Sequence, residues 1–161
     1  MTAVTDTSVV LNLCCLRQEN LMTRLFGSIL APPAVAGEFQ RLSRFDSRFH
    51  GLVFPAFIQI TIPSKVSASL VGNRKLHAGE IDALSLAIEK NADVVLMDEQ
   101  AGRITAGSMG LRCIGILGIL IQAKNAGLLP EVSPLLDRLE SQAGFWIAPT
   151  LRQRVLALVN E

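Results

Sequence analysis

Short β-type runs alternate with helical hydrophobic periods along the whole chain, and this alternation constrains the fold more than any other feature. It is typical of an α/β domain in which helices cover both faces of a parallel sheet. Strands are expected at residues 3–5, 28–31, 93–97 and 112–114, with an edge strand or extended loop at 57–62. We therefore expect one doubly wound layer structure.

Helices are expected between these runs, at residues 9–16, 19–26, 80–91, 100–109, 115–126, 131–143 and 150–159, and from Pro33 onward. Thr7 or Ser8 is expected to cap the first helix, because a hydroxyl oxygen accepts a hydrogen bond from the free N–H groups of a helix start. Residues 64–76 are also expected to be helical. No repeat or linker interrupts the pattern, so a single domain over residues 1–161 is expected.

The composition limits the function further. With 161 residues, of which 50% are hydrophobic, the chain can bury a sizeable core. Its net charge of +1 excludes a strongly basic protein that coats nucleic acid, although a local basic rim remains possible.

The three cysteines, Cys14, Cys15 and Cys113, fit neither a disulfide framework nor a tetrahedral zinc site, because their number is odd and two are adjacent. A reducing cytoplasm is therefore expected. The longest apolar run, residues 113–121, is about half of what spans a bilayer, so no membrane or export route is indicated.

Two aspartates, Asp6 and Asp98, each follow a predicted strand. In open parallel sheets the crevice beyond the carboxyl ends of the strands is where ligands bind, so the two acids could share a cation. The alternative is that each is a helix N-cap, a role that Asp fills well.

Two glutamates lie on helix faces that are otherwise apolar. Glu38 is three residues past Val35 and four before Leu42, which places it on their face. Glu80 is spaced by four from Leu84, although an acid at a helix start is also favoured by the helix dipole.

These four carboxylates, without a histidine or cysteine assigned to them, would form a hard oxygen site. Such a site suits Mg²⁺ or Mn²⁺ and can support metal-assisted hydrolysis of a phosphodiester.

The chain resembles PIN-domain nucleases. The resemblance rests on Thr-Asp-Thr-Ser at 5–8, Pro-Pro-Ala-Val-Ala-Gly-Glu at 32–38, Gly-Glu-Ile-Asp-Ala-Leu-Ser-Leu-Ala at 79–87 and Val-Leu-Met-Asp-Glu at 95–99, and it extends through Gly110-Leu111 and Gly115–Gly118. It is strongest for a prokaryotic subgroup related to VapC-type toxins. The resemblance implies a three-layer α/β/α domain with a central parallel sheet of about four to five strands.

The resemblance also implies a function. It suggests Mg²⁺- or Mn²⁺-dependent cleavage of RNA, often single-stranded, and a small antitoxin partner. A homodimer is also expected, since a chain this hydrophobic can pair through a leftover apolar surface. The family's four acids map to Asp6, Glu38, Glu80 and Asp98. The third position departs from the VapC-type pattern, where Asp is usual, and Asp82 and Glu99 are reserve candidates.

Cations alternate with aromatic residues in residues 41–50, as they would in a groove for single-stranded nucleic acid. Arg41, Arg44 and Arg48 are the candidates there, against the alternative of a solvated helix end. Arg103, five residues beyond Asp98, could hold a substrate phosphate or form a surface ion pair.

Two rival functions stay open. One is a catalytically silent PIN-like module that binds a partner. The other is a receiver-like signalling domain, since residues 92–98 resemble a strand that presents a phosphoacceptor aspartate, although the expected acidic pair and Lys-Pro are absent.

Overall fold

Five parallel strands form a single sheet in the computed structural model, which describes residues 1–161. The strands are β1 (Thr2–Thr5), β2 (Ser28–Ala31), β3 (Ile58–Ile60), β4 (Val94–Leu96) and β5 (Cys113–Ile114). Their order across the sheet is β3-β2-β1-β4-β5. Residues 57–62 therefore contain the edge strand that was one of the two expected possibilities.

The direction in which strands are added reverses at β1. The chain places β2 and β3 on one side of β1 and then crosses to place β4 and β5 on the other, so that Val4 pairs with Leu30 and with Val95. In open α/β sheets, ligands bind beyond the carboxyl ends of the strands at such a reversal. The order also differs from the 2-1-3-4-5 order typical of receiver-like folds, which argues against that rival.

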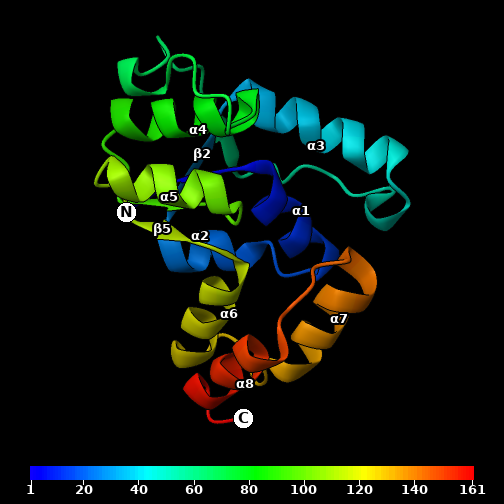
Figure 1. Cartoon of the computed structure of the whole chain (residues 1–161). Coiled ribbons are helices and arrows are strands. Elements are labelled where there is room, and N and C mark those ends of the chain that lie inside the picture. Colours follow the sequence, from blue (N-terminus) through cyan, green and yellow to red (C-terminus); the bar gives the residue numbers. More distant parts are fainter.

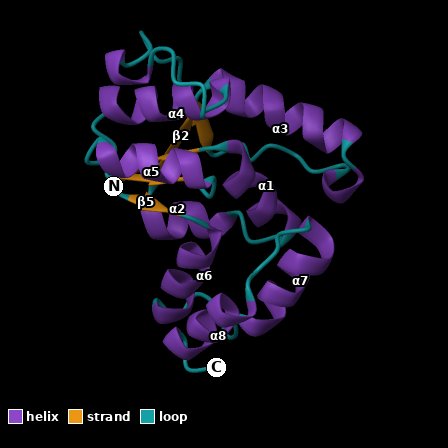
Figure 2. Ribbon diagram, viewed as in Figure 1, coloured by secondary structure: helices purple, strands orange, loops and turns teal.

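The chain forms eight helices, and Figures 1 and 2 show how they lie around and beyond the sheet. They are α1 (Thr7–Cys15), α2 (Asn20–Phe26), α3 (Pro33–Phe45), α4 (Ala78–Glu89), α5 (Gln100–Ser108), α6 (Ile116–Asn125), α7 (Ser133–Ala143) and α8 (Pro149–Leu158), with short 3₁₀ turns η1 (Ser47–Phe49) and η2 (Ala68–Leu70). Figure 1 shows α4 and α5 on one side of the sheet and α1, α2 and α6 on the other. The expected three-layer α/β/α architecture is confirmed.

Two hydrophobic clusters hold the layers together, one on each face of the sheet. Successive strand side chains point to opposite faces. Val4 and Val95 accordingly belong to the smaller cluster, beneath α4 and α5. Ala3 and Val94 belong to the larger one, which α7 and α8 extend outward from the sheet. No helix is long and apolar enough to cross a membrane.

The helix expected over residues 64–76 is wrong, because only Ala68–Leu70 form one 3₁₀ turn there. The backbone N–H of Ser64 donates to Glu89 of α4, and Gly72 has a φ of 77°. Serine and glycine favour such local bonds and turns over a helix, and this preference outweighs the weak apolar spacing of the segment.

Candidate active site

Asp6 lies between β1 and α1 and is the N-cap of that helix. Its Oδ1 accepts a hydrogen bond of 3.1 Å from the backbone N–H of Val9, and the hydroxyl of Ser8 donates to the same carboxylate. The expected cap at Thr7 or Ser8 is therefore wrong. Asp6 has extended backbone geometry, so the helix begins one residue after it. Burial raises the pKa of Asp6 to about 8, and the charges of Asp98 and Glu80 add to the rise.

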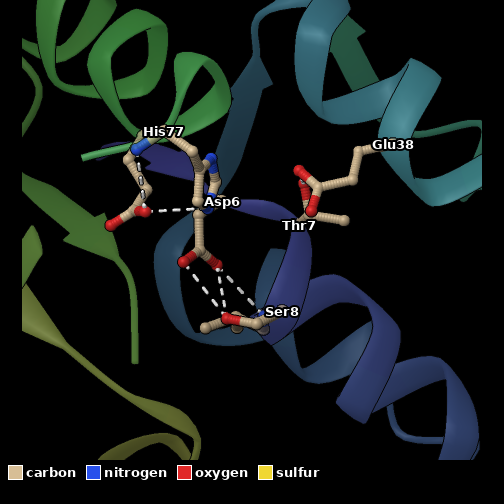
Figure 3. A network of polar contacts seen from close by, with 7 residues as sticks. Asp6, Thr7, Ser8, Glu38 and His77 are labelled. Atoms are coloured by element: carbon tan, nitrogen blue, oxygen red, sulfur yellow. Dashed lines mark hydrogen bonds and ion pairs between the residues drawn. The ribbon is translucent and has the colours of Figure 1, made fainter. Parts of the chain in front are cut away.

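Glu38 reaches from the middle of α3 toward the start of α1 (Figure 3). The hydroxyl of Thr7 donates a hydrogen bond of 2.9 Å to its Oε2. Thr7 is buried and Glu38 is half-buried, so the contact fixes one carboxylate oxygen at the edge of the core. It also joins α3 to the residue that follows Asp6.

Glu80 lies in the first turn of α4 and is 3% exposed. Its Oε1 lies 2.7 Å from Nε2 of His77 and accepts a hydrogen bond of 3.4 Å from the backbone N–H of that residue. Its Oε2 is buried without a hydrogen-bond partner. Burial raises the pKa of Glu80, the neighbouring His77 lowers it, and the charges of Glu99 and Glu38 raise it further.

Asp98 follows β4, but it caps a different helix from the one that comes next in the chain. Its Oδ1 accepts a hydrogen bond of 3.0 Å from the backbone N–H of Ile116, the first residue of α6. Its Oδ2 is buried without a partner. Burial raises the pKa of Asp98 to about 6, against the bond from Ile116 and the charge of Arg103, both of which lower it.

Two glycines make room for these carboxylates. A Cβ on Gly115 would collide with Oδ1 of Asp98. A Cβ on Gly102 would collide with Sδ of Met97 and would also lie 2.8 Å from Oε2 of Glu80. Gly115 has ordinary extended geometry, so close approach of the carboxylate, and not backbone freedom, explains this glycine.

The structure thus brings three of the predicted acids near Asp6. The charges of Asp98 and Glu80 act on Asp6, and that of Glu38 acts on Glu80. Of the reserve candidates, Glu99 lines a cavity of about 80 Å³ together with Asp6 and Glu38. Asp82, which is half-buried on α4, does not line this cavity.

The donor set fits a hard divalent cation. In the arrangement described here, no group of three or more His, Cys, Asp or Glu side chains is placed to hold one metal ion. Yet Glu80 and Asp98 each fix one oxygen to the protein and bury the other without a partner. An unpaired buried carboxylate oxygen is costly, and a cation is the ligand that would satisfy several of them together.

The four predicted arginines differ in their surroundings. Arg41 and Arg44 are exposed on α3 and line a cavity of about 600 Å³. Arg41 also lines a second cavity, of about 560 Å³, that reaches Glu38. Arg103 is exposed on α5, next to Asp98.

Arg48, by contrast, is held by contacts within the protein. Its Nη2 lies 2.7 Å from Asp46, its Nη1 donates to the carbonyl of Ala143, and its guanidinium lies over the ring of Phe49. These contacts tie η1 to the end of α7, which gives Arg48 a structural role.

The sequence analysis missed three contributors to the site: His77, Gly102 and Gly115. His77 could have been found, because it precedes Glu80 by three residues at a helix start, the spacing at which side chains meet. Gly115 belongs to the segment that carries the family resemblance, but no local pattern shows that it faces Asp98 or that Gly102 faces Glu80. The reason is that Asp98 precedes Gly115 by 17 residues and Glu80 precedes Gly102 by 22.

Comparison with known proteins identifies the family. A family model described as a PIN domain matches residues 2–161, almost the whole chain. No curated protein matches it. The match agrees with the parallel sheet and with the acids at its carboxyl edge. The chain therefore belongs to the PIN-domain family, whose members are generally nucleases.

Proposed function

We propose that this protein is a divalent-metal-dependent ribonuclease in which Asp6, Glu38, Glu80 and Asp98 hold one or two Mg²⁺ or Mn²⁺ ions. One observation carries the proposal: Oε2 of Glu80 and Oδ2 of Asp98 are buried without hydrogen-bond partners, in a group of acids whose charges raise the pKa of Asp6 and of Glu80. If these acids served only to stabilise the fold, both carboxylate oxygens of each would be expected to have hydrogen-bond partners.

Neighbouring hydrogen-bond donors orient the acids. The backbone N–H of Val9 and the hydroxyl of Ser8 hold the carboxylate of Asp6, and the backbone N–H of Ile116 holds one oxygen of Asp98. Thr7 and His77 do the same for Glu38 and Glu80. When bound, Mg²⁺ or Mn²⁺ would supply Lewis-acid activation of water and would neutralise charge that develops on the phosphodiester.

The location of the acids supports a polymeric substrate that passes the sheet edge. Asp6 and Asp98 follow the adjacent strands at which the strand order reverses, and two cavities lined by arginine reach Asp98 and Glu38. Arg41 and Arg44 would contact phosphates along α3, and Arg103 would contact one beside Asp98. An exposed groove lined by arginine is suited to a flexible single strand of RNA.

The resemblance to VapC-type toxins extends the proposal to partners. We propose that a small antitoxin binds the protein and blocks cleavage, and that the protein forms a homodimer. Co-expression with the product of an adjacent short reading frame should abolish cleavage, and the mass in solution should be twice that of one chain. A monomer that no such product inhibits would remove this part of the proposal and leave the nuclease part intact.

RNA cleavage tests the chemistry directly. Purified protein should cleave single-stranded RNA in Mn²⁺ and not in EDTA. Asp6→Asn, Glu80→Gln and Asp98→Asn should each remove most of the activity, and double variants should lose little more, because residues that act as one unit are not additive. Cleavage that survives EDTA or Asp98→Asn would contradict the proposal.

Thermal unfolding separates metal binding from cleavage. Millimolar Mn²⁺ should raise the Tm of the wild-type protein, since a ligand bound only by the folded state stabilises it. Asp6→Asn should abolish the rise, because Asn keeps the shape and the N-cap role but loses the charge. A Tm rise without cleavage of any RNA would instead favour the silent binding module.

A further inference from the structure

A further cavity, of about 450 Å³, opens beside Asp98, and Glu38 is not among the residues that line it. Asp98 and Arg103 form one part of its wall, and Phe145 and Trp146 form another. The cavity therefore joins the end of β4 to the segment between α7 and α8. Its volume lies in the range of pockets that bind small ligands or one unit of a polymer.

Trp146 is the only tryptophan of the chain and is 78% exposed. Its neighbours hold it there, because Phe145 is half-buried against the larger hydrophobic cluster and Ile147 is 4% exposed within it. With both neighbours anchored in the core, the indole is kept at the surface beside the cavity. A large aromatic ring fixed in this way offers contact area at low conformational cost.

Arg103 supplies a positive charge on the same wall. A Cβ on Gly115 would lie 2.7 Å from its Nη1 and would also collide with Asp98, so the guanidinium lies directly against the start of α6, beside the carboxylate. Arg103 is exposed and forms no ion pair within 4.0 Å. It is thus free to bind an anion.

We propose that this cavity is a nucleobase subsite, in which one base of the RNA strand stacks on Trp146 while Arg103 binds the phosphate next to that base. This proposal rests on the proposed ribonuclease function and adds how the strand is held at Asp98. Stacking on an aromatic ring tolerates any base, because every base has a π face. The subsite would therefore position the strand without selecting a sequence.

A second copy of this chain is the competing occupant, because Ile104 and Leu151 are also exposed around the cavity. A base is favoured for two reasons. The wall carries the carboxylate of Asp98, and acidic residues are depleted from protein interfaces. The cavity also reaches Asp98, which a nuclease must leave open to its substrate.

Intrinsic fluorescence tests the stacking directly, because all tryptophan emission comes from Trp146. A six-nucleotide oligoadenylate should quench the emission in EDTA at low salt, where no cleavage occurs. An abasic ribose-phosphate oligomer of the same length should bind without quenching. The anisotropy of labelled versions of both oligomers reports binding independently of the indole.

Two substitutions of Trp146 test how much stacking on the indole contributes to RNA binding. Trp146→Ala should weaken oligoadenylate binding and raise KM by about tenfold, with kcat nearly unchanged, because a stacked base contributes mainly uniform binding. Trp146→Phe should retain most of the affinity. The matched control is Val53→Ala, which shortens another apolar side chain that is 81% exposed, and it should leave binding unchanged.

The outcomes separate this proposal from the proposed function. Oligoadenylate that binds by anisotropy without changing the emission would overturn the subsite and leave the ribonuclease intact. Emission that changes with protein concentration alone, without RNA, would assign Trp146 to contact between copies and would also overturn it. Absence of both RNA binding and metal-dependent cleavage would overturn the two proposals together.

Discussion

The backbone N–H of Ile116 donates a hydrogen bond of 3.0 Å to Oδ1 of Asp98, so the carboxylate at the end of β4 caps the start of α6. The helix that follows Asp98 in sequence, α5, begins without a side-chain cap. One oxygen of Asp98 is therefore structural, and the other is buried without a partner. This division predicts different effects for two substitutions of the same residue.

Asp98→Asn should leave the free energy of unfolding unchanged or raised at pH 8 in EDTA. Asn keeps an oxygen for Ile116 and removes a charge that burial disfavours. Asp98→Ala should lower it by about 1 kcal/mol, because the cap is lost. Chemical denaturation measures both values. Clear destabilisation by Asn as well as Ala would mean that the charge itself stabilises the fold.

The metal-free protein should become less stable as the pH rises. The pKa of Asp98 is raised from 3.8 to about 6 and that of Asp6 from 3.8 to about 8, so the folded state binds more protons than the unfolded state above pH 3.8. The loss should continue as the pH passes through about 6 for Asp98 and about 8 for Asp6, and should level off above these values.

Denaturation in EDTA between pH 5 and pH 8 checks this slope. The loss should be on the order of 1 kcal/mol or more, and Asp6→Asn should reduce it. Saturating Mn²⁺ should flatten the slope, because a cation favours the ionised carboxylates. Stability that rises with pH in EDTA would show that these acids are stabilised as anions by the fold alone.

Gly115→Ala should disable the site while leaving the protein folded. The added Cβ would collide with Oδ1 of Asp98, and the extended backbone at this position tolerates alanine. Cleavage and the Mn²⁺-induced rise in Tm should both fall sharply. Gly107→Ala in α5 is the matched control, because nothing lies within 4 Å of its Cβ, and it should raise stability by up to about 1 kcal/mol. If both variants cleave RNA like the wild type, the position of Asp98 does not limit the reaction.

Arg44→Ala should weaken RNA binding and make the affinity less dependent on salt. The negative slope of log K against log salt concentration should become shallower by about one. Arg44 is exposed in a cavity that shares Gly37 and Arg41 with the cavity that reaches Glu38. Arg24→Ala is the control. Arg24 lies in the last turn of α2, just before β2 begins, and therefore near the amino-terminal ends of the parallel strands, whereas Asp6 and Asp98 lie at their carboxyl ends. Affinities measured by anisotropy at several salt concentrations test the pair. Equal effects of the two variants would show that only net charge matters.

Much of the fold could be predicted from local patterns. The strands at 28–31 and 94–96 and the helices that contain Glu38 and Glu80 follow from hydrophobic period, proline position and flanking glycine, which act over a few residues. The prediction of a helix over residues 64–76 was wrong, because the apolar spacing there is weak and hydrogen bonds made by the serines compete with a helix.

The sequence by itself determined which acids follow strands and which lie on apolar helix faces, because both properties depend on residue spacing alone. Only the tertiary structure decided that β1 and β4 are neighbours. This pairing brings Asp6 close enough to Asp98 for the charge of Asp98 to raise the pKa of Asp6. It also decided that Asp98 caps α6, that His77 holds Glu80, and that Trp146 faces the same cavity as Asp98. The order of strands and the packing of distant helices depend on contacts between residues far apart in the chain, and those contacts leave no local pattern.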